Sequence, residues 1–189
     1  MKTDWAPTLE GTFVRGDSLQ IMQTIPADSF DCVIMDPPYE HTRLINEAIG
    51  NALRISTGAT LCFMYPEDLV HLDHEPQQVV HWVKPVSTKN TTRKYSRFVE
   101  SICVWHGDFF NQRMHWSNRT GIFTDTLDLK NRHPFEKPAA LIRKLLLLHN
   151  RPDGKVLDPF AGSMTVRNVA RDLNLPSTSI EVDPGWWLR

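Results

Sequence analysis

The chain has 189 residues, 41% of them hydrophobic, and a formal net charge of −1. This length suits one domain with a full core and leaves no room for a second sizeable one. The near-neutral charge excludes a global basic field of the kind that announces a nucleic-acid partner, although a local basic patch can serve the same purpose.

Short apolar runs rich in β-branched residues predict the strands. They cover residues 12–17, 30–36, 59–65, 79–84, 101–107, 155–160 and 177–182. Most are apolar throughout, as expected where helices cover both faces of a sheet. Helical patterns occupy 41–56, 138–149 and 163–174. This alternation of strands and helices predicts an α/β fold with a mainly parallel sheet.

Two polar stretches do not fit the sheet. Residues 85–97 hold four Lys or Arg residues and no acid, and residues 108–132 are polar and aromatic. Both are predicted to be long loops at one edge of the sheet, and such loops are often functional.

The cysteines and the N-terminus predict the compartment. Cys32, Cys62 and Cys103 each lie in an apolar run without metal-ligand spacing, which is typical of buried free thiols in a reducing environment. The first residues form no apolar signal segment, and no apolar run approaches the roughly 18 residues of a membrane span. We expect a soluble protein of the cytoplasm, in a bacterial or phage-infected cell.

The stretch DCVIMDPPYE, residues 31–40, ends an apolar strand with an acid, two prolines and a tyrosine. The prolines keep the chain extended and remove two N–H donors. The Asp36 carboxylate and the Pro37 carbonyl remain as acceptors beside the Tyr39 ring. This set can hold an amino group on a planar ring and direct the nitrogen lone pair towards a methyl donor.

The stretch VLDPFAGSMT, residues 156–165, follows another strand with a turn of small residues. Gly162 permits close approach of a ligand to the backbone, and Asp158 is placed to accept from an ammonium group. Glu181 lies 23 residues further on, at the end of the next strand, where an acid binds ribose hydroxyls in dinucleotide folds. Because no G-x-G-x-x-G phosphate cradle is present, the pattern favours a ligand without phosphates, and S-adenosylmethionine matches.

Taken together, these motifs resemble those of the DNA amino-methyltransferases, the S-adenosylmethionine-dependent family that methylates adenine N6 or cytosine N4. DPPY resembles the catalytic motif and DPFAGSMT the cofactor motif. RHPFEKP (132–138) resembles the motif before the cofactor half, whose Lys137 helps enclose the methionine end. RGDSL (15–19) resembles the motif whose acid, Asp17, lies near the cofactor adenine. The catalytic motif comes first and the cofactor motif last, which is the permuted order of the family's β group.

The resemblance covers residues from about 12 to 184 and implies a Rossmann-like fold with a mixed, mainly parallel seven-stranded sheet and helices on both faces. It implies a single domain over 1–189, with a catalytic half (12–107), a short target-recognition segment (108–131) and a cofactor half (132–189).

The predicted site residues form three sets. Catalysis is assigned to Asp36, Pro37, Pro38 and Tyr39. Cofactor binding is assigned to Asp17, Asp36, Lys137, Asp158, Phe160, Ala161, Gly162, Ser163, Thr165 and Glu181. Contact with DNA is predicted for Lys84, Lys89, Arg93, Lys94, Arg97, Arg113, Trp116 and Arg119.

Two departures from the family pattern affect these expectations. Met164 stands where the family usually has a second glycine, which either narrows the cofactor pocket or shifts the turn. The segment 108–131 is short for target recognition, which predicts a short recognition site or a second copy of the chain that completes the DNA surface. Adenine is the preferred target, because motifs that begin with Asp mostly belong to adenine enzymes. The alternatives are cytosine N4, adenine in RNA, or a catalytically silent protein that binds the cofactor or nucleic acid.

Overall fold

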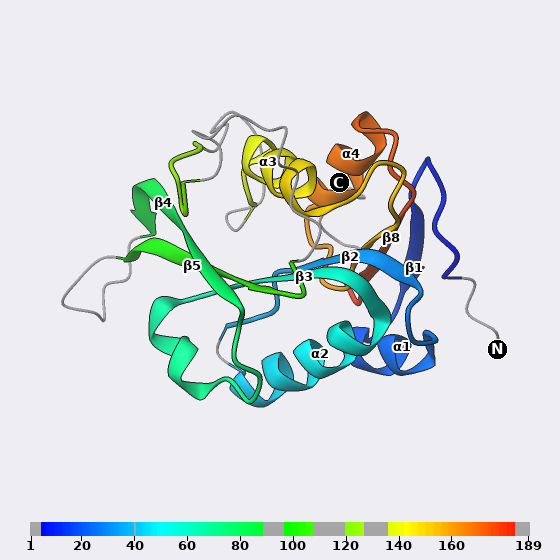
Figure 1. The fold of residues 1–189 in the computed structure, drawn as a ribbon, viewed down its shortest axis with the longest axis horizontal. Helices are drawn as coiled ribbons and strands as arrows, with labels where there is room; N and C mark the ends of the chain where they lie inside the picture. The colour runs from blue at the N-terminus through cyan, green and yellow to red at the C-terminus, as the bar shows by residue number, and fades with distance from the viewer. Residues whose placement is uncertain (1–4, 40, 89–96, 108–119, 127–135, 184–189) are drawn as a thin grey trace.

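The computed structural model describes residues 5–39, 41–88, 97–107, 120–126 and 136–183, and only the backbone of 85–88. One sheet forms the middle layer, with α1 and α2 on one face and α3 and α4 on the other (Figure 1). The strands are β1 (Thr12–Arg15), β2 (Phe30–Met35), β3 (Ser56–Met64), β4 (Gln78–Thr88), β5 (Arg97–Trp105), β6 (Ile122–Phe123), β7 (Val156–Asp158) and β8 (Ser177–Glu181). The helices are α1 (Ser18–Thr24), α2 (Thr42–Ile55), the 3-10 helix η1 (Pro66–His71), α3 (Ala139–His149) and α4 (Thr165–Asp172).

The strands of the described residues lie in the order β1-β8-β7-β2-β3-β5-β4-β6. β1, β8, β7, β2 and β3 run parallel, and β5 pairs antiparallel with both β3 and β4. The predicted α/β class with a mixed, mainly parallel sheet is confirmed. The predicted number of seven strands is wrong, because Ile122–Phe123 adds a short eighth strand that pairs parallel with β4.

The uniformly apolar runs reflect burial on both faces of the sheet. All six residues of β2 are buried. Cys32 and Ile34 pack with the core beneath α3 and α4, whereas Val33 and Met35 pack with the core beneath α1 and α2. Side chains alternate between the faces of a strand, so two covered faces favour apolar residues at successive positions, and the one acid of β2, Asp31, is buried with bonded partners.

The helices agree with the sequence in part. α2 and α3 lie within the predicted ranges, whereas α1 and η1 were not predicted. α4 begins at Thr165 rather than at 163, because Met164 has a left-handed backbone (φ 63°) and forms the N-cap. α1 is short and begins after Asp17, whose side chain accepts from the N–H of Gln20 at 2.9 Å.

The prediction of a loop over 85–97 is wrong at both ends. β4 continues to Thr88 and β5 begins at Arg97. The ladder between them shifts register between Val83 and Thr88, around Pro85, which has no N–H to contribute. Residues 89–96 lie outside the described part of the chain.

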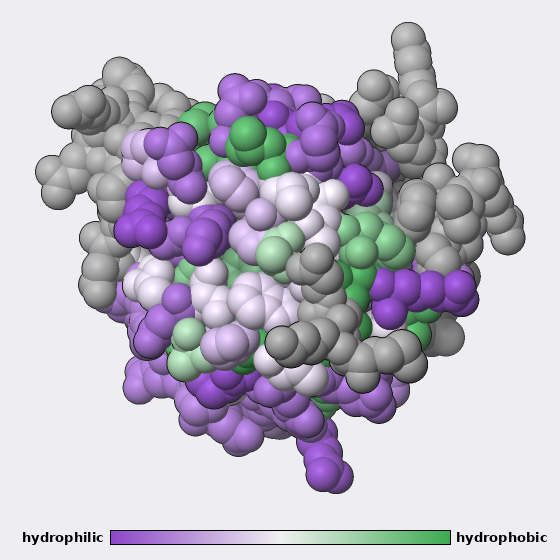
Figure 2. All heavy atoms as spheres, turned by 90° about the vertical axis from the view of Figure 1, so that its right-hand side faces the viewer, coloured by the Kyte–Doolittle hydropathy of each residue, from purple (hydrophilic) through white to green (hydrophobic). Residues whose placement is uncertain are grey.

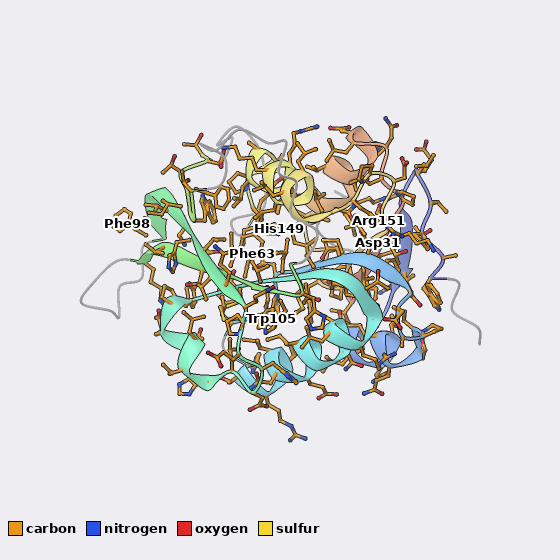
Figure 3. All side chains as sticks on the ribbon, viewed as in Figure 1. Asp31, Phe63, Phe98, Trp105, His149 and Arg151 are labelled. Atoms are coloured by element: carbon orange, nitrogen blue, oxygen red, sulfur yellow. The ribbon has the colours of Figure 1, made fainter. Side chains whose placement is uncertain are left out.

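An ion pair ties the amino ends of β2 and β7 together on the side away from the candidate site. Arg151 Nη2 lies 2.7 Å from Asp31 Oδ1, and Asp31 Oδ2 accepts from the backbone N–H of Lys155 at 2.7 Å (Figure 3). Asp31 is only 8% exposed, so these bonds satisfy a largely buried carboxylate.

The outer surface agrees with a fold whose apolar residues face the sheet. The side of the molecule shown in Figure 2 carries mainly polar residues, with apolar colour in small separate patches. Within the described residues, no helix is long and apolar enough to cross a membrane.

Candidate active site

A cavity of about 640 Å³ opens where the parallel strands end. Asp17 follows β1, Asp36 follows β2, Asp158 ends β7 and Glu181 ends β8. β2 and β7 are neighbours, and from them the chain proceeds to opposite sides of the sheet, to β3 and to β8. Such a switch point is where ligands bind in open α/β sheets. Every residue predicted for catalysis or cofactor binding lines this cavity, although their roles stay predictions.

A network of charges fills the β2 side of the cavity. Asp36 Oδ1 accepts from the Tyr39 hydroxyl at 2.5 Å, and Asp36 Oδ2 accepts from Lys137 Nζ at 2.7 Å. A second carboxylate, Glu100 on β5, lies within reach of the same donors, 3.1 Å from the Tyr39 hydroxyl and 3.2 Å from Lys137 Nζ. Lys84 Nζ on β4 donates to the other oxygen of Glu100 at 2.9 Å. Two ammonium groups therefore balance two carboxylates.

Opposite charges keep these buried groups ionised. Burial by itself would raise the pKa of Glu100, but Lys137 and Lys84 outweigh it and the pKa is lowered. Burial by itself would lower the pKa of Lys137, but Asp36 and Glu100 outweigh it and the pKa is raised. Burial, followed by the charges of Asp36 and Glu100, raises the pKa of Tyr39 well above its usual value. The tyrosine is therefore a neutral donor at physiological pH.

The Tyr39 ring, predicted as a platform for a base, meets a second aromatic ring. Tyr65 follows β3 and lies edge-on to Tyr39, with ring centroids 4.6 Å apart and an interplanar angle of 82°. The guanidinium carbon of Arg97 stacks 3.5 Å from the centroid of Tyr65, and Arg97 also pairs with Glu67. These contacts fix the aromatic wall of the cavity at the end of β3.

Asp158 dominates the β7 side of the cavity. Its carboxylate is 4% exposed and accepts from the backbone N–H of Phe160 at 3.1 Å. Burial raises its pKa to about 8, assisted by the negative charges of Asp36 and Glu181 and opposed by the Phe160 bond. A buried acid among other acids, without a cation beside it in the described part of the chain, favours a positively charged ligand at this position.

Gly162 and Glu181 form the rim next to Asp158. Gly162 has a left-handed backbone (φ 41°), and a Cβ there would project into open space, with no atom within 4 Å. Its N–H donates to Glu181 Oε2 at 2.7 Å, and Glu181 Oε1 accepts from the N–H of Asp183 at 2.9 Å. These bonds hold the carboxylate of Glu181 at the end of β8, facing the cavity. Ser163 and Thr165 continue this wall, with their hydroxyl oxygens 2.8 Å apart.

Met164 resolves the question raised by the missing glycine. Its side chain is 4% exposed and packs inward, and it is not among the described residues that line the cavity. The left-handed backbone at this position suits glycine better than methionine. Met164 therefore does not line the described pocket, and its effect on the turn stays a prediction.

Two of the residues predicted to contact DNA have partners within the protein, and their contact with DNA stays a prediction. Lys84 is 8% exposed and bonded to Glu100 inside the cavity wall. Arg97 is occupied by Tyr65 and Glu67 and is not a free surface cation. The remaining predicted contacts lie outside the described residues and stay predictions: Lys89, Arg93, Lys94, Arg113, Trp116 and Arg119.

Sequence reasoning missed Glu100, Tyr65, Glu136 and Ser18, all of which line the cavity. Ser18 donates to the carbonyl of Pro159 and thereby joins the start of α1 to the turn after β7. Glu100 left a signal in the sequence, because it is the single acid in β5, a mainly apolar strand. A single lysine in the neighbouring strand, Lys84, complements it.

Comparisons with known proteins place the chain among DNA methylases. Residues 69–186 match the N6/N4 methyltransferase family, described as DNA methylase. The chain is 23% identical over 232 residues to the DNA adenine methyltransferase YhdJ of Escherichia coli (strain K12), covering 90% of this chain and 79% of the relative.

Solved structures share the fold. The M1.HpyAVI–SAM complex has a TM-score of 0.73 at 21% identity, over 94% of this chain and 96% of that one. The cytosine-N4-specific PvuII DNA methyltransferase has a TM-score of 0.78 at 15% identity, over 98% of this chain and 87% of that one. TTHA0409 of Thermus thermophilus, complexed with S-adenosyl-L-methionine, has a TM-score of 0.72 at 16% identity, over 94% of this chain and 90% of that one.

Proposed function

Because the chain belongs to the N6/N4 DNA methylase family and is therefore an S-adenosylmethionine-dependent DNA methyltransferase, we propose that its target is the N6 amino group of adenine in DNA. The observation that carries this proposal is the single cavity that joins the Asp36 carboxylate to the buried Asp158. A donor bound at Asp158 and an amine bound at Asp36 would lie at the ends of neighbouring parallel strands.

The β7 side of the cavity fits S-adenosylmethionine. The whole cavity, with both sides included, has a volume of about 640 Å³, within the range of about 300–1,000 Å³ usual for small-molecule sites. Asp158 is a buried acceptor suited to the ammonium group, and the space at Gly162 leaves room for a ligand against the backbone. Glu181 is suited to the ribose hydroxyls, and Asp17 to the neighbourhood of the adenine. The cofactor supplies the electrophilic methyl group on its sulfonium.

The β2 side fits the amine of a base rotated out of the duplex. The Asp36 carboxylate and the Pro37 carbonyl accept the two amino hydrogens, and Tyr39 supplies an aromatic ring beside the base. Two acceptors on those hydrogens favour a pyramidal nitrogen whose lone pair is available for attack. A strong base is unnecessary before the transfer, since the proton can leave afterwards. Asp36 therefore serves as acceptor and orienting group.

Adenine is favoured over cytosine by two observations. DPPY begins with Asp, as the adenine enzymes of this family mostly do, and the relative YhdJ is named an adenine methyltransferase. The fold does not distinguish the two bases, because a cytosine-N4 enzyme is as similar in shape as the others. Chemically the two amines are alike, so the same acceptors serve either base.

Nucleoside mass spectrometry tests the proposal. The purified protein is incubated with S-adenosylmethionine and unmethylated duplex DNA, with RNA in parallel, and the digested nucleosides are analysed. N6-methyladenine in the DNA alone is expected. N4-methylcytosine would overturn the choice of base, and a product only in RNA would overturn the choice of nucleic acid. The Asp36→Asn variant, with cofactor binding measured alongside, shows that any product depends on this site.

A further inference from the structure

Glu100 takes no part in the chemistry proposed above, yet it is buried in the wall of the cavity with three donors around it. Lys84 Nζ lies at 2.9 Å, the Tyr39 hydroxyl at 3.1 Å and Lys137 Nζ at 3.2 Å from its oxygens. Removing charges from water is costly, and apolar replacement of such ion pairs is often neutral or stabilising. Stability alone therefore gives little reason for a buried carboxylate and lysine at this position.

Asp36 shares two of these three donors. Its Oδ1 accepts from the Tyr39 hydroxyl at 2.5 Å and its Oδ2 from Lys137 at 2.7 Å. The hydroxyl has one hydrogen and two carboxylates within reach, and it lies closer to Asp36. An amine that binds Asp36 competes with that hydroxyl for Oδ1. A displaced hydroxyl in a buried position needs another acceptor, because an unsatisfied polar group there is expensive.

On the basis of the proposed function, we propose that Glu100 is a positioning residue that receives the Tyr39 hydroxyl when Asp36 binds the target amine. The exchange requires a rotation of the hydroxyl hydrogen and only a small displacement of the oxygen, since Glu100 Oε2 already lies 3.1 Å away. No covalent bond changes. Lys137 bridges both carboxylates before and after the exchange, so the local charge stays balanced.

Lys84 holds Glu100 in place for this purpose. Glu100 pairs with Trp82 across the β4–β5 ladder, and Lys84 is two residues further along β4 on the same face. This diagonal arrangement lets the lysine side chain reach the acid. The Lys84 bond uses Glu100 Oε1 and leaves Oε2 to Tyr39 and Lys137. The lysine that the sequence assigned to DNA thus becomes part of the support of the catalytic residues.

A double-mutant cycle tests the proposal. The first change is Lys84→Met/Glu100→Leu, which removes one charge of each sign and leaves Asp36 and Lys137 paired. The second is Tyr39→Phe, which removes only the hydroxyl. Transfer of labelled methyl groups to DNA gives kcat and KM for the wild type, both variants and their combination. Binding of S-adenosylhomocysteine and thermal unfolding report on the cofactor site and the fold.

The charge-balanced change is expected to lower kcat about 10- to 100-fold in the wild-type background, the factor associated with a hydrogen bond to a charged group. In the Tyr39→Phe background it should lower kcat less than about threefold, because no hydroxyl needs a new acceptor. KM for DNA and cofactor affinity should change less than about threefold in both backgrounds. Tyr39→Phe alone should retain transfer within about tenfold of the wild type, since the proposal requires the hydroxyl to leave Asp36.

Three outcomes would overturn the proposal. Equal losses in both backgrounds would make Glu100 a structural support without a link to Tyr39. No loss in the wild-type background would show that Glu100 is unnecessary, and loss of transfer in Tyr39→Phe alone would show that the hydroxyl must stay on Asp36. Wild-type protein that transfers no methyl group to DNA would instead refute the proposed function, and this inference would end with it.

Discussion

The affinity for the cofactor should depend on pH through Asp158. Its carboxyl group is buried and its pKa is raised to about 8, chiefly by burial, so the empty site holds this acid mostly protonated at neutral pH. A bound ammonium group favours the carboxylate and drives the proton out. Binding below pH 8 is therefore coupled to proton release, and affinity should fall as the solution is acidified.

The expected magnitude follows from the fraction of Asp158 that is ionised in the empty site. With a pKa of about 8, roughly a quarter of the molecules carry the carboxylate at pH 7.5 and roughly 0.3% at pH 5.5. The α-amino group of the ligand, with a pKa of about 8, remains mostly protonated over this range. Relative to pH 7.5, the product of the two fractions predicts a Kd about 50-fold larger at pH 5.5, which is a loss of about 2 kcal/mol of binding free energy.

Isothermal titration calorimetry with S-adenosylhomocysteine measures this coupling directly. Titrations at pH 6.5 in buffers of different ionisation enthalpy should give nearly one proton released per ligand bound. Asp158→Asn keeps an oxygen acceptor but cannot titrate, so its Kd should be nearly flat between pH 5.5 and 7.5. Methylthioadenosine, which has the adenosine but no amino-acid part, is the matched control ligand and should bind the wild type without a pH slope.

The stability of the empty protein should change in the opposite sense. The folded state binds the Asp158 proton more tightly than the unfolded chain, where the pKa is near 3.8. This group therefore favours folding at low pH, and its contribution is lost as the pH rises from about 4 to about 8.

In the calorimetry experiment, a wild-type protein that releases no proton on binding the ligand, or an Asp158→Asn variant whose Kd has the same pH slope, would refute the assignment of Asp158 to the ammonium group.

Further predictions concern catalysis, the turn and the structural ion pair. Asp36→Asn should lower kcat more than about 100-fold while S-adenosylhomocysteine still binds, and transfer at the wild-type rate would contradict the role of acceptor for the base. Met164→Gly should relieve a left-handed backbone worth about 1 kcal/mol but lose a buried side chain worth about 2–5 kcal/mol. Urea unfolding should therefore show a net destabilisation, and a gain would contradict it. Asp31→Ala should cost about 2–3 kcal/mol by leaving the N–H of Lys155 unpaired, whereas Arg151→Ala, at the exposed end of the pair, should cost less than about 1 kcal/mol.

The parts of the site that the sequence predicted share one physical property. Asp36 follows β2 and Asp158 ends β7, and every residue of both strands is buried because both faces of the sheet are covered there. The carboxyl ends of parallel strands meet at one edge of the sheet. Acids predicted at the ends of such strands are therefore expected to lie close together. Glu181 ends β8 at the same edge, although this strand is buried through Ser177, Thr178 and Ser179 rather than through an apolar run.

The parts that were missed depend on pairing between strands. Glu100 lies inside β5, and its position beside Lys84 is fixed by the antiparallel register with β4. A one-residue slip of that register would turn the acid to the other face of the sheet, and local sequence carries little information about register. The inward path of Met164 depends similarly on a backbone angle that methionine itself does not favour.

The permuted order of the motifs has little physical consequence, because the order of the strands in the sheet brings the motifs close together in space. Lys137 and Asp36 are 101 residues apart in the chain and 2.7 Å apart in space. β2 pairs with β7, so the acids that begin the two motifs lie at the ends of neighbouring strands, and the charge of Asp36 contributes to the raised pKa of Asp158. Lys137 neutralises Asp36 from the side of Glu100, and a cationic ligand would neutralise Asp158 from the other side. The electrostatic state of the methyl acceptor site and that of the donor site are therefore coupled across a single strand interface.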